Sequence, residues 1–206
     1  MKAMLINGSP HADGCTATAL REVEKTLGSH GIETELFWIG TKPVAGCIAC
    51  GQCVKSGLCT LGDRVNEVIE KLDGIDALVV GSPVYYAAAS GQITAFLDRL
   101  FYAAGGRMAG KLGAAVVSCR RGGAATAFDQ LNKYFTISCM PVVSASYWNQ
   151  VHGNTPEEVL QDLEGMRTMR VLGENLAWLL RVIEAGRKAG VPEPVYEPQV
   201  RTNFIR

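Results

Sequence analysis

The 206-residue sequence lacks long hydrophobic runs and lacks net charge. No apolar stretch approaches the roughly 20 residues that a membrane-spanning helix needs. The start, MKAMLINGSP, offers too few apolar residues for the core of a signal peptide. The 20 Lys and Arg residues are balanced by 20 Asp and Glu residues, which removes the basic footprint of a nucleic-acid or anionic-membrane binder. We therefore expect a cytoplasmic protein with neither a nucleic-acid nor a membrane partner.

Several patterns that mark well-known sites are also missing. The chain has no Gly-Lys-Ser/Thr sequence and no dinucleotide-binding glycine triplet. Its three histidines, at 11, 30 and 152, are too far apart to suggest a metal site, and His152 is expected on a surface loop. The seven cysteines come without an export signal. That favours a reducing cytosol, in which thiols serve metals or redox chemistry more often than structural disulfides.

What is present is an alternation of strand-like and helix-like segments, which we interpret as a single domain spanning residues 1–206. Short apolar runs that end in turn signals predict strands, and apolar residues at helical spacing predict helices. Strands are expected at 3–7, 34–39, 77–80, 113–119 and 141–148. This alternation implies right-handed crossovers and an α/β fold, with a five-stranded parallel sheet covered by helices on both faces in three layers.

The boundaries of the helices and loops carry their own signals. Gly28 predicts the end of the first helix, and Asp63 and Ser90 stand where N-caps are expected. Residues 40–62, rich in glycine and cysteine, are expected to form a largely irregular insertion. Residues 189–206, which contain three prolines, are expected to form an extended tail.

The C-terminal helix has the strongest start signal in the chain. Thr155 and Pro156, followed by a glutamate at 158, predict a capping box with proline in the first turn. The helix is expected to run to about residue 188, with Gly165 and Gly173 as candidate kinks.

Ligands of such sheets bind beyond the carboxyl ends of the strands, and three loops are expected there. The first, NGSPHADGCT at 7–16, offers the hydroxyls of Ser9 and Thr16 and the free N–H groups of a helix start. These groups suit a phosphate. The absence of lysine favours a phosphomonoester such as the tail of FMN, and the alternative is an ordinary strand-to-helix turn.

The second loop is GSPVYYAAASGQ at 81–92. Ser82 and Pro83 predict a sharp turn. Tyr85 and Tyr86 follow, where a flat ring system could lie against the loop. The alternative is that these tyrosines belong to the core or to a subunit contact.

The third loop is SCRRGGA at 118–124. Gly122 and Gly123 permit close approach of the backbone to a ligand. Arg120, Arg121 or the loop amides could stabilise negative charge on a reduced cofactor. A solvated surface is the alternative for each arginine.

The segments LINGSPHADGCTATAL, LVVGSPVYYAAASGQITAFLDRL and VVSCRRGG resemble the NAD(P)H-dependent FMN reductases of the flavodoxin-like superfamily. The resemblance spans nearly the whole chain, and is closest to the branch with a compact cysteine motif, which includes the iron–sulfur flavoproteins. It implies a flavodoxin-like three-layer sandwich that binds FMN. The family's phosphate loop commonly has arginine and asparagine where this chain has His11 and Cys15.

The resemblance also implies which residues hold the cofactor. The phosphate would be held by Ser9, His11, Gly14, Cys15 and Thr16. The isoalloxazine ring would be bordered by Pro83, Val84, Tyr85 and Tyr86, and its pyrimidine side by Ser118, Arg120, Arg121, Gly122 and Gly123. FMN would carry the chemistry, so no catalytic side chain is expected.

Four cysteines lie within thirteen residues in the stretch GCIACGQCVKSGLCT, in the pattern Cys-x2-Cys-x2-Cys-x5-Cys. Cys47, Cys50, Cys53 and Cys59 could wrap a 4Fe–4S cluster, although no proline follows the fourth cysteine. Zinc is less suited, because structural zinc sites usually split their ligands into two separated pairs. A metal-free loop at a subunit interface remains the alternative. The other three cysteines are expected to be small buried side chains: Cys15, Cys119 and Cys139.

Together these features predict an FMN-dependent oxidoreductase that takes hydride from NAD(P)H and passes electrons to a small acceptor such as a quinone, flavin, azo or nitro compound. One alternative is an iron–sulfur flavoprotein that passes electrons between FMN, a 4Fe–4S cluster and a protein partner. Another is a non-enzymatic flavodoxin-like electron carrier or a thiol redox sensor. The resemblance further implies a homodimer or higher homo-oligomer, in which the cysteine loop covers a neighbour's FMN.

Overall fold

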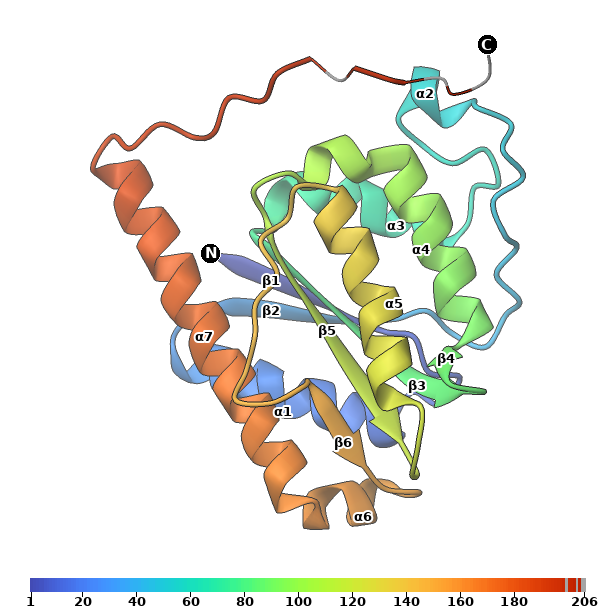
Figure 1. Ribbon diagram of the computed structural model, residues 1–206, viewed down its shortest axis with the longest axis vertical. Coiled ribbons are helices and arrows are strands. Elements are labelled where there is room, and N and C mark those ends of the chain that lie inside the picture. Colours follow the sequence, from blue (N-terminus) through green and yellow to red (C-terminus); the bar gives the residue numbers. More distant parts are fainter. Residues whose placement is uncertain (199, 203, 205–206) are drawn as a thin grey trace.

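The chain folds around a parallel sheet whose strands lie in the order β2-β1-β3-β5-β6, as a computed structural model shows for residues 1–198, 200–202 and 204 (Figure 1). A short strand, β4, pairs antiparallel with β3. The strands are β1 (Lys2–Asn7), β2 (Glu33–Trp38), β3 (Ala77–Tyr85), β4 (Ala88–Ala89), β5 (Leu112–Cys119) and β6 (Gln150–His152). The expected α/β class and parallel sheet are confirmed.

Helices cover both faces of this sheet (Figure 1). They are α1 (Cys15–Ser29), α2 (Cys53–Ser56), α3 (Arg64–Lys71), α4 (Gly91–Ala104), α5 (Ala124–Ile137), α6 (Pro156–Gln161) and α7 (Leu163–Lys188), with short 3₁₀ turns at Leu72–Gly74 and Gly105–Met108. None of the helices in the described residues is long and apolar enough to cross a membrane.

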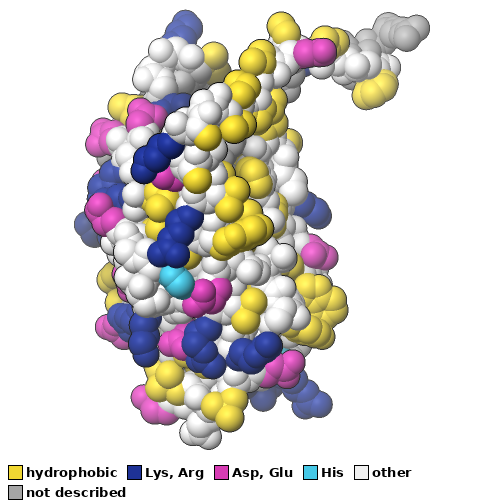
Figure 2. Space-filling view, turned by 90° about the vertical axis from the view of Figure 1, so that its left-hand side faces the viewer, with side chains coloured by type: hydrophobic (Ala, Val, Ile, Leu, Met, Phe, Trp, Pro, Cys, Tyr) yellow, Lys and Arg dark blue, Asp and Glu magenta, His cyan; other side chains and the backbone are white. Residues whose placement is uncertain are grey.

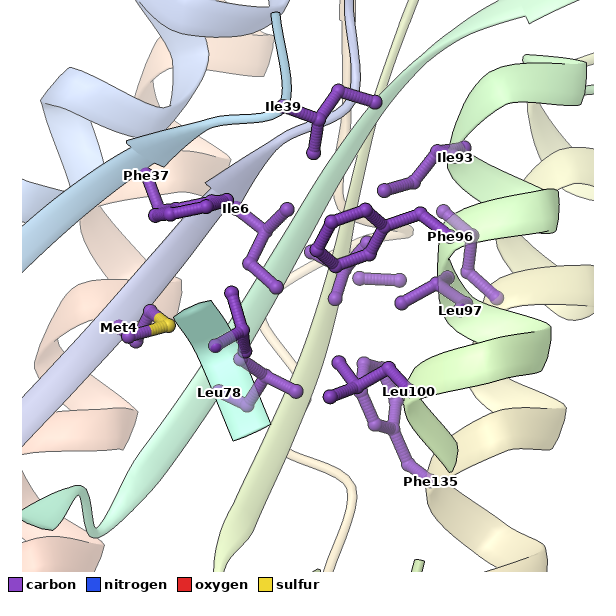
Figure 3. Packing of buried hydrophobic residues seen from close by; sticks show 14 of the residues in the cluster. Met4, Ile6, Phe37, Ile39, Leu78, Ile93, Phe96, Leu97, Leu100 and Phe135 are labelled. Carbon is purple, nitrogen blue, oxygen red and sulfur yellow. The ribbon is translucent and has the colours of Figure 1, made fainter. Parts of the chain in front are cut away.

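Two apolar cores result, one on each side of the sheet. Along β1, Met4 and Ile6 join the core beneath α3, α4 and α5, whereas Ala3 and Leu5 join the core beneath α1 and α7. The period-two alternation of a strand explains this division. Figure 3 shows the first core, where Phe96 of α4 points toward residues of β1 and β2.

On the second face, α7 packs against α1. Gly173 of α7 permits the close approach, since a Cβ there would lie 2.6 Å from the Thr26 Cβ of α1. Figure 2 shows basic and acidic side chains interspersed on the α7 side of the molecule. One ion pair there joins Arg170 to Glu22 at 2.6 Å.

The third strand is longer than the sequence predicts. No sharp turn occurs at Ser82-Pro83, because the strand continues in register beside β5, with Ser82 opposite Val117 and Pro83 opposite Ser118. The chain reverses later, at a two-residue turn between Tyr85 and Ala88. Proline is tolerated here because β1 pairs with β3 only as far as Gly81, so Pro83 has an unpaired side where no donor is required.

The fifth parallel strand is not where the sequence predicts it. Residues 141–148 form only an isolated bridge, between Gly113 and Val142, and the paired strand β6 follows at Gln150–His152. Between them Asn149 takes over the edge of β5: its carbonyl accepts from Val117 N at 2.9 Å and its side-chain amide donates to Ala115 O at 3.0 Å. An asparagine side chain therefore replaces part of the ladder.

The N-caps predicted for three helices are confirmed. Asp63 and Ser90 cap α3 and α4 as predicted, and Thr155 caps α6 by accepting from Glu158 N. The long C-terminal helix breaks at Asp162 rather than at a glycine, because that carboxylate accepts from Gly165 N at 2.9 Å and from His152 N at 2.7 Å.

The first helix ends slightly later than expected, whereas α7 ends at Lys188 as expected. The first helix runs past Gly28 to Ser29, and Gly31 takes the left-handed conformation after it. Residues 40–62 are irregular apart from α2, as predicted. The described part of the 189–206 tail has no regular secondary structure and crosses from the end of α7 toward α2 (Figure 1).

Candidate functional site

The first predicted loop leads from β1 directly into the N-terminus of α1. That helix begins at Cys15 with Gly14 as N-cap, without a side-chain cap and without an acidic residue in its first turn. Its first N–H groups are therefore available to an anion and carry the positive end of the helix dipole. Gly14 is required sterically, since a Cβ there would lie 2.9 Å from the His11 Cβ.

Hydrogen bonds join the first loop to the second and third. Gly8 N donates to Gly81 O at 2.8 Å, and the Ser90 hydroxyl donates to Gly8 O at 2.9 Å. The buried hydroxyls of Thr16 and Ser118 lie 2.8 Å apart. The residues predicted from three separate segments therefore converge on one edge of the sheet.

The second loop is a tight hairpin between β3 and β4 that displays tyrosine. Tyr86 and Ala87 form its tip with φ of 50° and 59°, a conformation that residues other than glycine and asparagine seldom adopt. Tyr85 is half exposed and Tyr86 is fully exposed. Neither tyrosine belongs to the core, so the core alternative is excluded for both within this chain.

The third loop lies against the second. Gly123 has φ of 89°, and a Cβ there would lie 2.7 Å from the Ala87 Cα, so only glycine fits this approach. Arg120, Arg121 and Gly122 are exposed at the same edge.

These features fit FMN. An uncapped helix start provides a phosphate seat. The second and third loops, whose contact depends on Gly123, leave tyrosines and arginines facing solvent beside it. The contacts of each predicted residue with the cofactor remain a prediction.

Sequence reasoning missed two residues that shape the phosphate loop. Trp38, at the end of β2, donates its Nε1–H to Ser9 O at 2.8 Å. Asn7, fully buried, accepts from Ser9 N at 3.0 Å and donates to His11 O at 3.2 Å. An asparagine that ends a buried strand immediately before Gly-Ser-Pro was the available signal.

Cys119 and His152 lie together on the neighbouring strand ends, with Sγ 3.4 Å from Nδ1. Burial raises the pKa of the Cys119 thiol, which favours its neutral form. Of the three cysteines expected to be buried, Cys119 is buried, Cys15 is partly buried and Cys139 is exposed. The expectation was wrong for Cys139, which lies beyond the end of α5 with φ of 55°.

The four clustered cysteines line a single hollow against α4. Cys47 and Cys50 come from the irregular segment, Cys53 from α2, and Cys59 from the segment just before α3. Arg99, Tyr102 and Ala103 of α4 line the same hollow. The thiols are free, and within the described residues no three His, Cys, Asp or Glu side chains are already gathered at metal-binding distance.

Arg99 contacts this hollow from the side of the protein body, although its side chain is only 1% exposed. It makes a two-pronged ion pair with Asp63, with both N–O distances 2.7 Å. Its Nε–H donates to the Cys59 sulfur at 3.2 Å. The Arg99 guanidinium holds the pKa of Asp63 below its ordinary value, and Asp63 in turn raises the pKa of Arg99.

The donor set fits a 4Fe–4S cluster. Four thiols and no carboxylate line the hollow, and the buried cation beside it compensates negative thiolate charge. Cys47 and Cys50 lie in irregular chain, whereas Cys53 begins α2 and Cys59 lies between α2 and α3.

The parallel sheet order, with an uncapped helix start after the first strand, defines a flavodoxin-like α/β protein. Comparison with known proteins then identifies the family. Residues 1–155 match the model of the NADPH-dependent FMN reductase family. The chain belongs to this family of FMN-binding flavodoxin-like reductases.

A curated relative is an iron–sulfur flavoprotein of Methanocaldococcus jannaschii, 33% identical over 192 residues that cover 89% of this chain and 100% of the relative. Among solved structures, RosB with a bound riboflavin-5'-phosphate derivative has a TM-score of 0.69 at 15% identity and covers 100% of this chain and 93% of its own. A flavodoxin from the domain Archaea has a TM-score of 0.58 at 16% identity, over 88% of this chain and 99% of its own. The two structures support the fold.

Proposed function

We propose that this protein is a redox flavoprotein with two centres. FMN binds at the flavin edge, the sheet edge where the loops after β1, β3 and β5 meet, and a 4Fe–4S cluster binds in the cysteine hollow, the hollow lined by the four clustered cysteines and α4. The observation that carries the proposal is the convergence of Cys47, Cys50, Cys53 and Cys59 on one hollow beside a buried cation. The similarity to an iron–sulfur flavoprotein over the whole length of that relative supports it.

At the flavin edge, the role of the chain is to bind and orient FMN. The first turn of α1 holds the phosphate through N–H groups, while Thr16 and Ser118 fix the distance between the first and third loops. The hairpin tip and Gly123 form the wall beside the ring. Bound FMN supplies the chemistry of accepting electrons in pairs and releasing them singly.

In the cysteine hollow the chain supplies thiolates and charge compensation. Cys59 is anchored to the protein body by hydrogen bonds, and Cys53 lies on α2. Cys47 and Cys50 are exposed and lie in irregular chain. A bound cluster supplies one-electron transfer, which matches the single-electron release of FMN.

Anaerobic purification followed by iron, sulfide and flavin analysis tests this proposal. The wild type is expected to contain about four iron and four sulfide ions per chain together with FMN. Cys50→Ser is expected to lose iron and keep FMN, because Cys50 is exposed and distant in sequence from the flavin loops. FMN without iron in the anaerobic wild type would contradict the two-centre proposal.

A second function is favoured by the exposed flavin edge. Tyr85 and Tyr86 face solvent at the hairpin, which leaves room for a flat ring such as nicotinamide or an acceptor beside the flavin. On this proposal NAD(P)H is the hydride donor, and a small quinone, flavin, azo or nitro compound is the acceptor.

Steady-state oxidation of NADH and NADPH with each acceptor class tests the second function. Turnover above the uncatalysed rate, lost on removal of FMN and restored by FMN, is expected. Turnover at background with every pair would leave an electron carrier or thiol sensor as the better description. A carrier would still exchange electrons with a protein partner, whereas a sensor would change its oligomeric state with thiol oxidation.

A further inference from the structure

Arg99 ties the cysteine segment to the protein body at both of its ends. Besides its bond to Cys59 Sγ at 3.2 Å, its Nη1 donates to Ala45 O at 3.3 Å, just before the first cysteine. A buried arginine is costly unless its donors are satisfied, and here they are met by Asp63, Ala45 and Cys59. Apolar replacement of a buried ion pair is often neutral or stabilising, so helix stability alone does not account for an arginine here.

Cys59 is the most firmly fixed of the four cysteines. Its backbone N–H donates to Asn66 Oδ1 at 2.8 Å, and its carbonyl accepts from Asn66 Nδ2 at 2.9 Å. With the bond from Arg99 to its sulfur, main chain and side chain are both held from α3 and α4. Cys47 and Cys50 are exposed, so the hollow has one preset ligand and a more open opposite side.

We propose that Arg99 is a positioning residue for the cluster: its Nε–H fixes the Cys59 sulfur and makes the cluster easier to reduce. This inference rests on the proposed two-centre function and adds a residue that controls the potential of the second centre.

The physical reason is charge. Reduction adds one electron, and hence one negative charge, to the cluster and its thiolates, while no bond to the protein forms or breaks. A hydrogen bond to a ligand sulfur, donated by a cation in a low-dielectric site, stabilises the more negative state. Chemical reductant supplies the electron in the test below, and FMN supplies it in the proposed function.

Asp63 partly opposes this effect. Its carboxylate pairs with the outer side of the same guanidinium and cancels part of the positive charge. Replacing Asp63 by asparagine keeps an N-cap for α3 and leaves the Arg99 charge uncompensated. Arg99→Met and Asp63→Asn should therefore shift the midpoint potential of the cluster in opposite directions, which a purely structural role would not produce.

The experiment is an anaerobic redox titration of the FMN-containing protein, followed by electron paramagnetic resonance of the reduced cluster. Arg99→Met is expected to shift the midpoint to more negative potential and Asp63→Asn to more positive potential. Arg99→Lys keeps the charge without the fork and is expected to lie between wild type and Arg99→Met. Arg107→Met removes a surface pair with Asp73 near the end of α4 and serves as the matched control, with no shift expected.

FMN content reports whether each variant has folded. An unchanged midpoint in an FMN-containing, cluster-containing Arg99→Met variant would overturn the proposal, as would shifts of the same sign in Arg99→Met and Asp63→Asn. Loss of iron with FMN retained in Arg99→Met supports the positioning role. If Arg99→Met loses its iron or does not fold, the midpoint potential of Arg99→Lys is the test. A midpoint more negative than that of the wild type supports the proposal, and an unchanged midpoint overturns it.

Trypsin digestion of the iron-free protein tests the role of Arg99 independently of whether a cluster is bound. Lys55, exposed on α2, is the one trypsin site between residues 45 and 62. In iron-free protein, Arg99→Met is expected to be cut after Lys55 several-fold faster than wild type or Arg107→Met, because both ends of the segment are released. Equal cleavage rates would overturn the positioning role, whereas absence of iron from the anaerobic wild type would contradict the two-centre function instead.

Discussion

At the scale of single residues, the flavin edge depends on positions where no side chain fits. Gly123 combines a left-handed φ of 89° with a backbone neighbour 2.7 Å from the place of a Cβ. Neither constraint can be relieved by rotating a side chain, because the obstructing atom is the Cα of Ala87. The contact between the second and third loops therefore requires glycine.

Gly123→Ala is expected to lower the free energy of unfolding by about 2 kcal/mol or more, from left-handed strain and the clash together. FMN affinity should fall with it, since the two loops can no longer meet. Thermal unfolding of the FMN-free protein and fluorescence titration with FMN measure the two effects. Gly106→Ala is the control, because no atom lies within 4 Å of its Cβ position and its φ is not left-handed. Equal stability of the two variants would contradict the steric account.

The Asp63–Arg99 pair gives stability a predictable dependence on pH. Arg99 lowers the pKa of Asp63 in the folded protein from an ordinary value of 3.8. A depressed carboxyl pKa stabilises the fold fully above the unfolded value, and this contribution is lost as pH falls through the folded value.

Asp63→Asn is therefore expected to cost about 1 to 2 kcal/mol at pH 7, a range reduced because the carboxylate is 37% exposed. The difference from wild type should shrink as pH falls below about 4. Urea unfolding at pH 7, 5, 4 and 3 measures it. A difference that stays constant down to pH 3 would show that the pair is not the source of the loss.

At the residue scale, the sequence predicted the N-cap at Asp63 but not the burial of Arg99. The cap at Asp63 was visible, because an aspartate before an apolar helical stripe satisfies local N–H groups whatever the tertiary structure. The ion pair of Asp63 with Arg99 could not be predicted, because the burial of Arg99 depends on how α4 packs against the cysteine segment. The available hint was a charge within the stripe formed by Phe96, Leu100 and their neighbours.

At the scale of elements, α7 and α1 approach each other through a glycine. Gly173→Ala would gain helix propensity but place its Cβ 2.6 Å from the Cβ of Thr26. We expect a net loss of about 1 to 3 kcal/mol, because the obstruction is a branched side chain on a packed helix.

Gly186→Ala, in the same helix, is the matched control. Its Cβ would find Val191 atoms at 3.8 Å, an ordinary contact, so the substitution should stabilise by about 0.5 to 1 kcal/mol. Chemical denaturation of both variants measures the change in the free energy of unfolding that each substitution causes. A stabilising Gly173→Ala would mean that the two helices are not held at close range.

The strands show where sequence patterns stop being informative. The β-branched and aromatic content of 141–148 predicts a strand, yet only Val142 forms a bridge there. The edge of β5 is instead completed by Asn149 and by β6. Local composition identifies a segment that can pair, but the neighbouring strand determines which of its residues do.

At the scale of the whole molecule, the two proposed centres occupy different parts of one chain. The flavin edge belongs to the loops after β1, β3 and β5, whereas the cysteine hollow lies between the 40–62 segment and α4. The parallel sheet and the ligand-binding edge could be predicted from alternating elements, whereas the order of the strands was not predicted. The hollow could not, because its floor is supplied by α4 residues whose spacing reads as ordinary core.

The measurement that tests the two-centre account most directly is a stoichiometric reductive titration of anaerobically purified protein, followed by visible absorbance. The account predicts that full reduction takes about three electrons per chain, two for FMN and one for the cluster. It also predicts that Cys50→Ser takes about two. Uptake of only two electrons by the wild type, with a spectrum identical to that of Cys50→Ser, would contradict the account.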